Sequence, residues 1–260
     1  AMIQIVAELG INHGGDVDVA NEMIVEAQRA GCTGVKIQTS RWQDFLGEDH
    51  PQRGMFEQCE IWPHIRELAG TTHDCGLLFG TTPTSIEGVQ EAVDAGCDFL
   101  KNGSDFLLRH DLIQAMLDTG LPTWVSTGMA TWDEIDVLPS GAKLMLCTSL
   151  YPCPDEEANL ARLFDDGGVF QGFSDHTMGS TAAVIAAAYG VEMIEKHFTL
   201  DRGADGPDHA WSTDPDEMHE LVQAVRKAET QLGSGALGFT PGEADKRNRW
   251  RVTEEALRSG

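Results

Sequence analysis

Two lysines and two histidines occur inside otherwise apolar segments of this sequence, where an ionisable side chain needs a specific reason. Lys36 lies in GVKIQT, Lys101 in DFLKNGS, His176 in VFQGFSDH and His197 in VEMIEKHFT. A buried lysine is costly unless an anion pairs with it, and ammonium groups neutralise phosphate oxygens. Neutral imidazoles on neighbouring strands suit a first-row divalent metal. The four residues therefore indicate an anion-binding site beside two candidate metal ligands.

The alternation of side chains along a strand separates residues that face this site from residues that do not. Lys36 and Gln38 share one face of their segment, as do Glu195 and His197. Lys196 points to the opposite face, so the favoured interpretation for it is a structural ion pair.

Hydroxyl side chains follow several of the same apolar segments, and they include Thr82, Ser104, Ser126 and Ser149. Lysines and hydroxyls together resemble a phosphate-binding site more than a hydrolytic one. Gly103 and Gly128 would let backbone approach a ligand closely. The sequence has no GxGxxG or GxxxxGK[ST] element, so a nucleotide cofactor is not indicated.

Structural interpretations stay open for these groups. Lys36 and Lys101 could each belong to a buried ion pair, and Glu8 is a plausible partner for Lys36. Histidines in a core are often hydrogen-bonded to backbone, so spacing alone leaves the metal undecided.

Eight short apolar segments predict strands buried on both faces of a parallel sheet. They are residues 3–10, 34–39, 77–83, 98–104, 122–128, 143–149, 169–176 and 191–199. Helical periodicity separates most of them, at residues 19–30, 85–95, 107–119, 180–189 and 214–232. This alternation predicts an α/β fold, a (β/α)8 TIM barrel, whose active site lies at the C-terminal ends of the strands. A doubly wound sheet is the alternative.

The remaining segments define the expected domain organisation. The catalytic barrel is predicted to span residues 1–235, and residues 236–260 are read as an extended C-terminal arm or linker without a second domain. Two helices, at 131–139 and 156–165, are barely long enough for a crossover. Residues 40–60 form a longer excursion after the second strand and are interpreted as a lid.

The composition excludes several classes of protein. The net charge of −24 argues against nucleic acid and anionic membranes as partners. No apolar run is long enough to span a bilayer, no signal peptide is visible and the six cysteines show no CxxC spacing. We therefore expect a cytoplasmic protein with reduced, mostly buried thiols.

Seven segments at and around these residues resemble the sialic acid synthase family, which includes synthases of N-acetylneuraminate, legionaminate, pseudaminate and spore-coat sugar acids. They are AELGINHGG (7–15), VKIQT (35–39), STGMAT (126–131), CTSLYPCP (147–154), FSDHTMG (173–179), IEKHFTLD (194–201) and GPDH (206–209). The resemblance runs from about residue 8 to residue 233, in the family's order, so it covers nearly the whole predicted barrel.

This resemblance implies a reaction and roles for particular residues. The family condenses phosphoenolpyruvate with an N-acetylated hexosamine and releases phosphate and a 2-keto-3-deoxy sugar acid. The reaction needs a divalent metal, which is usually Mn²⁺; Mg²⁺ and Co²⁺ are the alternatives. By motif, His176 and His197 correspond to the metal ligands, and Glu8 to the carboxylate that handles a proton. The phosphoenolpyruvate site would comprise Lys36, Thr82, Lys101, Ser104, Ser126, Ser149 and Ser174. The acceptor side would comprise Gln38, Tyr151, Glu195 and Asp208, and the predicted catalytic residues are Glu8, Lys36, Lys101 and Glu195.

The sequence also departs from the family. Members normally continue into an antifreeze-like domain, which in a swapped dimer lends an arginine to the partner's acceptor pocket, whereas residues 240–252 resemble only the linker before it. Asp105 stands where the family tends to carry Glu. The oligomeric state stays open, with a homodimer as one candidate, and the acceptor stays open as well. The alternatives for the function are another aldose or an aldose phosphate as acceptor, a non-catalytic phosphoenolpyruvate- or sugar-binding barrel, and a metal-dependent hydrolase.

Overall fold

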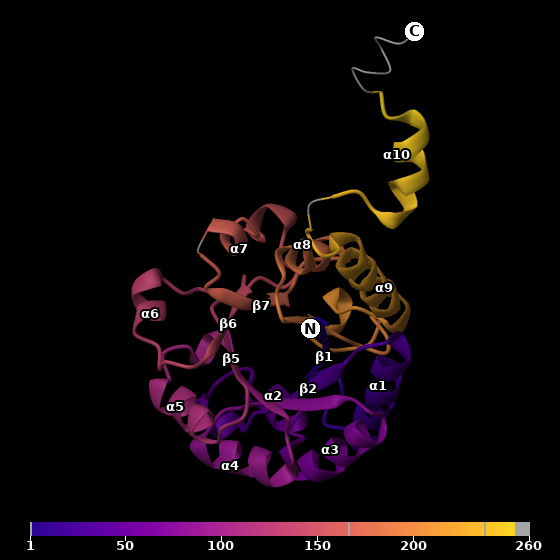
Figure 1. The fold of residues 1–260 in the computed structure, drawn as a ribbon. Helices are drawn as coiled ribbons and strands as arrows, with labels where there is room; N and C mark the ends of the chain where they lie inside the picture. Colours follow the sequence, from indigo (N-terminus) through magenta and orange to yellow (C-terminus); the bar gives the residue numbers. More distant parts are fainter. Residues whose placement is uncertain (1, 166, 237, 253–260) are drawn as a thin grey trace. The chain divides into compact units, whose positions relative to one another are not determined.

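The computed structural model describes residues 2–165, 167–236 and 238–252, and its strands close into a barrel (Figure 1). All neighbouring strands are parallel, and β8 pairs with β1. The strands are β1 Gln4–Gly10, β2 Gly34–Thr39, β3 Leu78–Pro83, β4 Phe99–Asn102, β5 Thr123–Ser126, β6 Lys143–Cys147, β7 Phe170–Asp175 and β8 Met193–His197. The predicted (β/α)8 TIM barrel is confirmed, because closure between β1 and β8 excludes an open doubly wound sheet.

Helices surround the barrel, and each of the connections between consecutive strands contains at least one (Figure 1). They are α1 Val17–Ala30, α2 Arg53–Gln58, α3 Ile65–Asp74, α4 Ile86–Ala95, α5 His110–Asp118, α6 Trp132–Asp136, α7 Arg162–Asp165, α8 Thr181–Tyr189 and α9 Pro215–Leu232. In α1 the Asp16 side chain accepts the first backbone N–H groups, and Gly31 ends the helix in the left-handed conformation. Its buried stripe contains Ala20, Met23 and Ala27, as the sequence periodicity predicts.

The excursion after β2 is more ordered than predicted. It contains α2 and a full helix, α3, that the sequence reading missed. Helix α3 buries Ile65, Leu68, Ala69 and Thr72, which have helical spacing, and its remaining residues are mostly polar, so the periodicity was present in the sequence and was overlooked. Several strands are also shorter than predicted, and residues 103–104, 127–128 and 148–149 lie just beyond them.

The barrel interior is built in two layers. The lower layer is an apolar cluster of Val6, Phe99, Trp124, Met145 and Met193, and an ideal Cβ at Gly80 would lie 2.1 Å from the Phe99 ring. Two residues further along the same strands come Glu8, Lys101, Ser126, Cys147 and Glu195. Because side chains alternate along a strand, these polar groups point into the barrel directly above the apolar layer. The lower layer therefore forms the floor of whatever site the upper layer makes.

The chain divides into two compact units, residues 1–229 and 230–260. The second unit was predicted to be an extended arm, but part of it, Ala244–Trp250, forms helix α10. Its 3₁₀ turn, Pro241–Glu243, has a capping box between Thr240 and Glu243. Within the described ranges, no helix combines the length and apolar character needed to cross a membrane. All six cysteines are free, as expected.

Candidate active site

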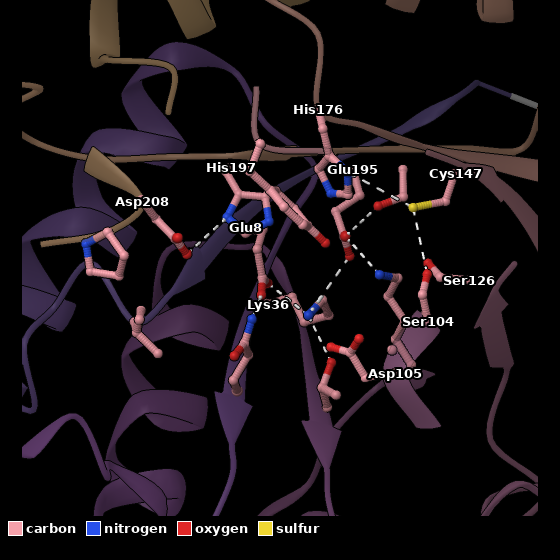
Figure 2. A pocket seen from close by; sticks show the side chains of 18 of the residues that line it. Glu8, Lys36, Ser104, Asp105, Ser126, Cys147, His176, Glu195, His197 and Asp208 are labelled. Carbon is pink, nitrogen blue, oxygen red and sulfur yellow. Dashed lines mark hydrogen bonds and ion pairs between the residues drawn. The ribbon is translucent and has the colours of Figure 1, made fainter. Parts of the chain in front are cut away.

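A cavity of about 280 Å³ opens where the C-terminal ends of the strands meet (Figure 2). Every predicted site residue except Ser149 lines it, namely Glu8, Lys36, Gln38, Thr82, Lys101, Ser104, Ser126, Tyr151, Ser174, His176, Glu195, His197 and Asp208. Ser149 lines a neighbouring cavity together with Cys147, and it lies close to Ser104, since an ideal Cβ on Gly128 would be 2.2 Å from Ser149 Oγ and 2.7 Å from Ser104 Oγ. The structure thus brings the predicted residues together; the role of each stays a prediction.

Two lysines and two carboxylates form a continuous buried chain across the cavity (Figure 2). Lys36 Nζ lies 2.8 Å from Glu8 Oε2 and 3.8 Å from Glu195 Oε2. Lys101 Nζ lies 2.8 Å from Glu195 Oε1. Gln38 donates to Glu8 Oε1 over 3.0 Å. The ion pair anticipated for Lys36 is present, and it lies within the candidate site.

The two carboxylates of this chain have opposite electrostatic environments. Burial raises the pKa of Glu8, and the nearby Glu195 raises it further, against the effect of Lys36. Burial also disfavours the charged form of Glu195, but Lys101 and Lys36 outweigh it and lower the pKa of Glu195 to about 2. A pair of carboxylates whose pKa values are pushed apart divides into a proton carrier and a permanent anion. Glu8 suits the first part and Glu195 the second.

Hydroxyl groups border the lysines and include two without a partner. Lys36 donates to Thr82 Oγ1 over 2.8 Å, and Ser174 donates to Glu195 Oε1 over 3.0 Å. In the described part of the chain, Ser126 Oγ and Ser149 Oγ are buried with no hydrogen-bond partner. Buried polar groups are normally satisfied, so orphaned hydroxyls at a cavity are natural contacts for ligand oxygens.

The two predicted metal ligands lie side by side, with ring centroids 5.4 Å apart. The Nδ1 of His176 hydrogen-bonds the carbonyl of Thr148 over 2.8 Å, which leaves Nε2 with its lone pair. Burial, reinforced by His176, lowers the pKa of His197 and keeps that imidazole neutral, and its Nδ1 has no hydrogen-bond partner in the described chain. Burial disfavours the charged form of His176, but its contacts with Cys147 and the Thr148 carbonyl together raise the pKa of His176 above its usual value. In their neutral forms the two imidazoles offer nitrogen lone pairs that fit a divalent metal.

Protein ligands alone would not complete such a metal site. Within residues 2–165, 167–236 and 238–252, no three His, Cys, Asp or Glu residues are grouped so that they could hold a metal ion. A metal on His176 and His197 would therefore take its other ligands from substrate and water. Asp208 Oδ2 lies 3.8 Å from His197 Nδ1, and burial raises the pKa of Asp208 to about 6.

Aromatic rings hold the two imidazoles in place. The Tyr151 ring lies 4.4 Å from His176, and the Trp211 ring lies 4.5 Å from His197, centroid to centroid. The two aromatic rings also contact each other at 5.1 Å. Trp211 was not among the predicted site residues, since no strand or motif with a predicted role contains it.

Cys147 lines the cavity, although the sequence reading treated it only as a buried thiol. Its Sγ lies 3.6 Å from Ser104 Oγ and 3.8 Å from His176 Nδ1. Burial favours the neutral thiol, but the hydrogen bond and charge of His176, the charge of Lys101 and the hydrogen bond with Ser104 together outweigh burial and lower the pKa of Cys147. The alternation of β6, which turns Met145 and Cys147 inward, is the signal that could have identified it.

One wall of the cavity was missed by sequence reasoning. Ile11, Gln52, Met55, Phe56 and Pro207 form it, and they come from connecting loops and α2 rather than from strands. The C-terminal end of α2 packs against the loop after β1, where an ideal Cβ at Gly15 would lie 2.0 Å from the carbonyl oxygen of Gln58. The predicted lid region thus contributes to the cavity wall.

Lys196 lies outside the cavity, as its place in the strand predicted. Its Nζ lies 2.8 Å from Asp175 Oδ2 and also donates to the carbonyl oxygen of Thr177. Asp175 Oδ1 in turn accepts the Thr177 backbone N–H over 2.9 Å. The predicted structural ion pair is confirmed, and it fixes the chain on both sides of His176.

Comparison with known proteins agrees with this arrangement. A model of the NeuB family matches residues 23–236. The N,N'-diacetyllegionaminic acid synthase of Legionella pneumophila is 32% identical over 89% of this chain and 73% of its own length. The N-acetylneuraminate-9-phosphate synthase of Mus musculus is 30% identical over 92% and 74%. A crystal structure of N-acetylneuraminic acid synthetase from Leptospira borgpetersenii, in complex with citrate, is 30% identical and superimposes with a TM-score of 0.88 over 97% of this chain and 94% of that one.

Proposed function

The chain belongs to the NeuB family, and we propose that it condenses phosphoenolpyruvate with an N-acetylhexosamine-like aldose. The products would be a 2-keto-3-deoxy sugar acid and phosphate, with a divalent metal, Mn²⁺ in the first instance. One observation carries the proposal: two buried lysines, the unpartnered hydroxyl of Ser126 and two imidazoles line a single cavity. A hydrolase would have no use for the lysine and hydroxyl set.

The donor would bind at the lysine end of the cavity. Lys101 is held 2.8 Å from Glu195 Oε1, so its ammonium group is already oriented before an anion arrives. Although burial opposes the charged form, Glu195 raises the pKa of Lys101 and keeps it a cation. Fixed ammonium and hydroxyl groups stabilise an anion without reorganising during the reaction. Glu195 is thereby a positioning residue for the two lysines.

Glu8 would serve as the proton carrier of the reaction. Water adds to C2 of phosphoenolpyruvate while C3 adds to the aldehyde carbon. The proton lost by the water is balanced by the proton gained at the new hydroxyl, and phosphate then leaves C2 to form the 2-keto group. Glu8 lies between Lys36 and Gln38, and its raised pKa brings it nearer the operating pH of a general base. Its Oε1 is fixed by Gln38, which orients the carboxylate within the cavity.

His176 and His197 would hold the divalent metal, which, when bound, supplies Lewis-acid polarisation of the acceptor aldehyde. The chain's own part is to present both imidazoles in a fixed orientation. The Thr148 carbonyl fixes the His176 ring, and Trp211 packs against the His197 ring.

The test is release of phosphate from phosphoenolpyruvate, measured with Mn²⁺ and an N-acetylhexosamine, together with mass detection of the sugar acid. Lys101→Met should abolish turnover. Lys143→Met is the matched control, since Lys143 is partly exposed, lies at the start of β6 and pairs with Glu192 away from the cavity. If metal-supplemented enzyme bound phosphoenolpyruvate without product from any aldose tested, a non-catalytic binding barrel would replace the synthase.

A further inference from the structure

One ion pair lies directly beside the two candidate metal ligands, on the side of the strands that faces the helices. Asp175 ends β7 immediately before His176, and Lys196 precedes His197 at the end of β8. Asp175 and Lys196 are direct partners in the register between these parallel strands, and Lys196 Nζ lies 2.8 Å from Asp175 Oδ2. The pair therefore joins the two strands at the positions next to both imidazoles.

The same face of these strands is apolar two residues earlier. Phe173 and Ile194 are register partners there, and both are buried in the hydrophobic core. Asp175 and Lys196 are buried to a similar degree, with 1% and 3% of their surface exposed. A buried ion pair is often no more stabilising than apolar side chains of similar size. The change from an apolar to an ionic pair beside the imidazoles therefore indicates a role other than stability.

The ion pair also holds the chain that follows His176. Lys196 donates a second hydrogen bond to the Thr177 carbonyl oxygen. Asp175 Oδ1 accepts the backbone N–H of Thr177 over 2.9 Å and its hydroxyl over 2.7 Å. The carbonyl oxygen of His176 accepts the Cys153 N–H over 2.8 Å. The backbone is thus fixed before, at and after His176, and Lys196 links this segment to β8.

The two imidazoles come from separate strands, so their mutual geometry depends on how those strands are joined. Their ring centroids lie 5.4 Å apart, and both residues are buried. Ligands from two strands bind a metal well only when the spacing and direction of their nitrogen atoms are set in advance. Charged hydrogen bonds have preferred lengths and directions, which apolar contacts lack. An ionic link can therefore fix this geometry more closely than an apolar pair.

We propose that Asp175 and Lys196 are positioning residues that set the spacing of His176 and His197 for a divalent metal. The inference rests on the metal assignment within the proposed function, but not on the identity of either substrate. Neither side chain is among the described residues that line the cavity, so both would act through the histidines. The pair would thereby contribute to the affinity of the site for metal, in addition to its structural role.

The experiment measures binding of Mn²⁺ alone to the full chain at about pH 8, where histidines with ordinary pKa values are neutral. Calorimetry gives the dissociation constant, and electron paramagnetic resonance measures free Mn²⁺ in the same samples. His197→Ala gives the background binding by acidic surface groups, which must be subtracted because the chain has a net charge of −24. Urea unfolding of every variant separates loss of fold from loss of metal affinity.

The test variant is Asp175→Leu combined with Lys196→Met, which replaces the pair by apolar side chains and leaves no unpaired buried charge. Its dissociation constant for Mn²⁺ should rise about 10- to 100-fold, the usual effect of losing groups that orient metal ligands. Thr177→Val removes only the hydroxyl contact with Asp175 and should raise the constant about threefold. It replaces the double variant in the test if that protein does not fold.

The matched control is Lys143→Met combined with Glu192→Gln, which removes another ion pair between strand ends. Lys143 begins β6 and Glu192 directly precedes β8, so this pair lies at the opposite end of the strands from the imidazoles. The control should keep the Mn²⁺ dissociation constant within about twofold.

The outcomes separate this inference from the proposed function. A folded double variant, or in its place Thr177→Val, that bound Mn²⁺ as tightly as the unmodified protein would overturn the inference and leave the proposed function standing. Unmodified protein that bound Mn²⁺ no better than His197→Ala would remove both the metal assignment and the inference. Weaker Mn²⁺ binding by the double variant would support the inference even if the protein formed no sugar acid, a result that would refute the proposed function alone.

Discussion

Gly128→Ala is the sharpest test of whether the hydroxyls of Ser104 and Ser149 contact phosphoenolpyruvate, as proposed. The new Cβ would lie 2.2 Å from Ser149 Oγ and 2.7 Å from Ser104 Oγ, so both hydroxyls must move. Gly128 lies outside the left-handed region, so its backbone accepts alanine, and the perturbation falls on the two serine hydroxyls. A hydrogen bond to a charged group contributes about 1.5–3 kcal/mol. Losing one such bond to the donor's phosphate would raise its KM about 10- to 150-fold.

The assay is steady-state phosphate release against phosphoenolpyruvate concentration, with thermal unfolding measured in parallel. Gly103→Ala is the matched control, because Gly103 lines the cavity and its ideal Cβ has no neighbour nearer than the Phe106 Cδ2 at 4.0 Å. That variant should keep KM within about twofold. A folded Gly128→Ala protein with unchanged KM would show that Ser104 and Ser149 do not contact the donor.

Three other predictions address the remaining parts of the structure. Lys196→Met should destabilise the protein by about 3–5 kcal/mol in urea unfolding, because Asp175 loses its buried partner; an unchanged midpoint would contradict the ion pair's role. Burial lowers the pKa of His13 from 6.5 to about 4, so the unfolded chain takes up a proton in this window and the folded chain does not. Stability should therefore fall by about 3 kcal/mol as pH drops from 6.5 to 4, and His13→Gln should flatten that slope in urea unfolding at a series of pH values. Chelation of divalent metals should abolish condensation, and added Mn²⁺ should restore it in the unmodified protein but not in His197→Ala. Calorimetry should show that His197→Ala binds Mn²⁺ more weakly. Full activity after chelation would show that the reaction does not need the metal.

The parts of the fold that the sequence predicts best are those with strong local periodicity. The alternation of β8 correctly separates Glu195 and His197 from Lys196, because successive side chains along a strand point alternately into and out of the barrel. The pairing of Glu195 with Lys101 was not predicted, since it joins strands on different sides of the barrel and depends on closure. The structure shows Glu195 beside the two lysines, and its role on the acceptor side stays a prediction.

The loop wall was beyond sequence reasoning for a different reason. Helix α2 is only six residues long and buries none of them, so it has no apolar stripe to recognise. Its position depends on the contact between Gly15 and the end of the helix, which tertiary packing determines. Local pattern cannot place Met55 and Phe56 in a cavity that distant strands complete.

The cavity's two sides have different structural origins, and this has a consequence for divergence within the family. Under the proposed function, the donor would be bound by strand ends that barrel closure holds in register, and the acceptor by α2 and the loop around Asp208. Connecting loops accept replacement far more readily than strands. New acceptors can therefore be acquired by exchanging loops while the condensation machinery is inherited unchanged. Replacing residues 40–64 by the corresponding segment of a relative, while keeping Gly15 so that the end of α2 can pack against it, should change the acceptor preference to that of the relative.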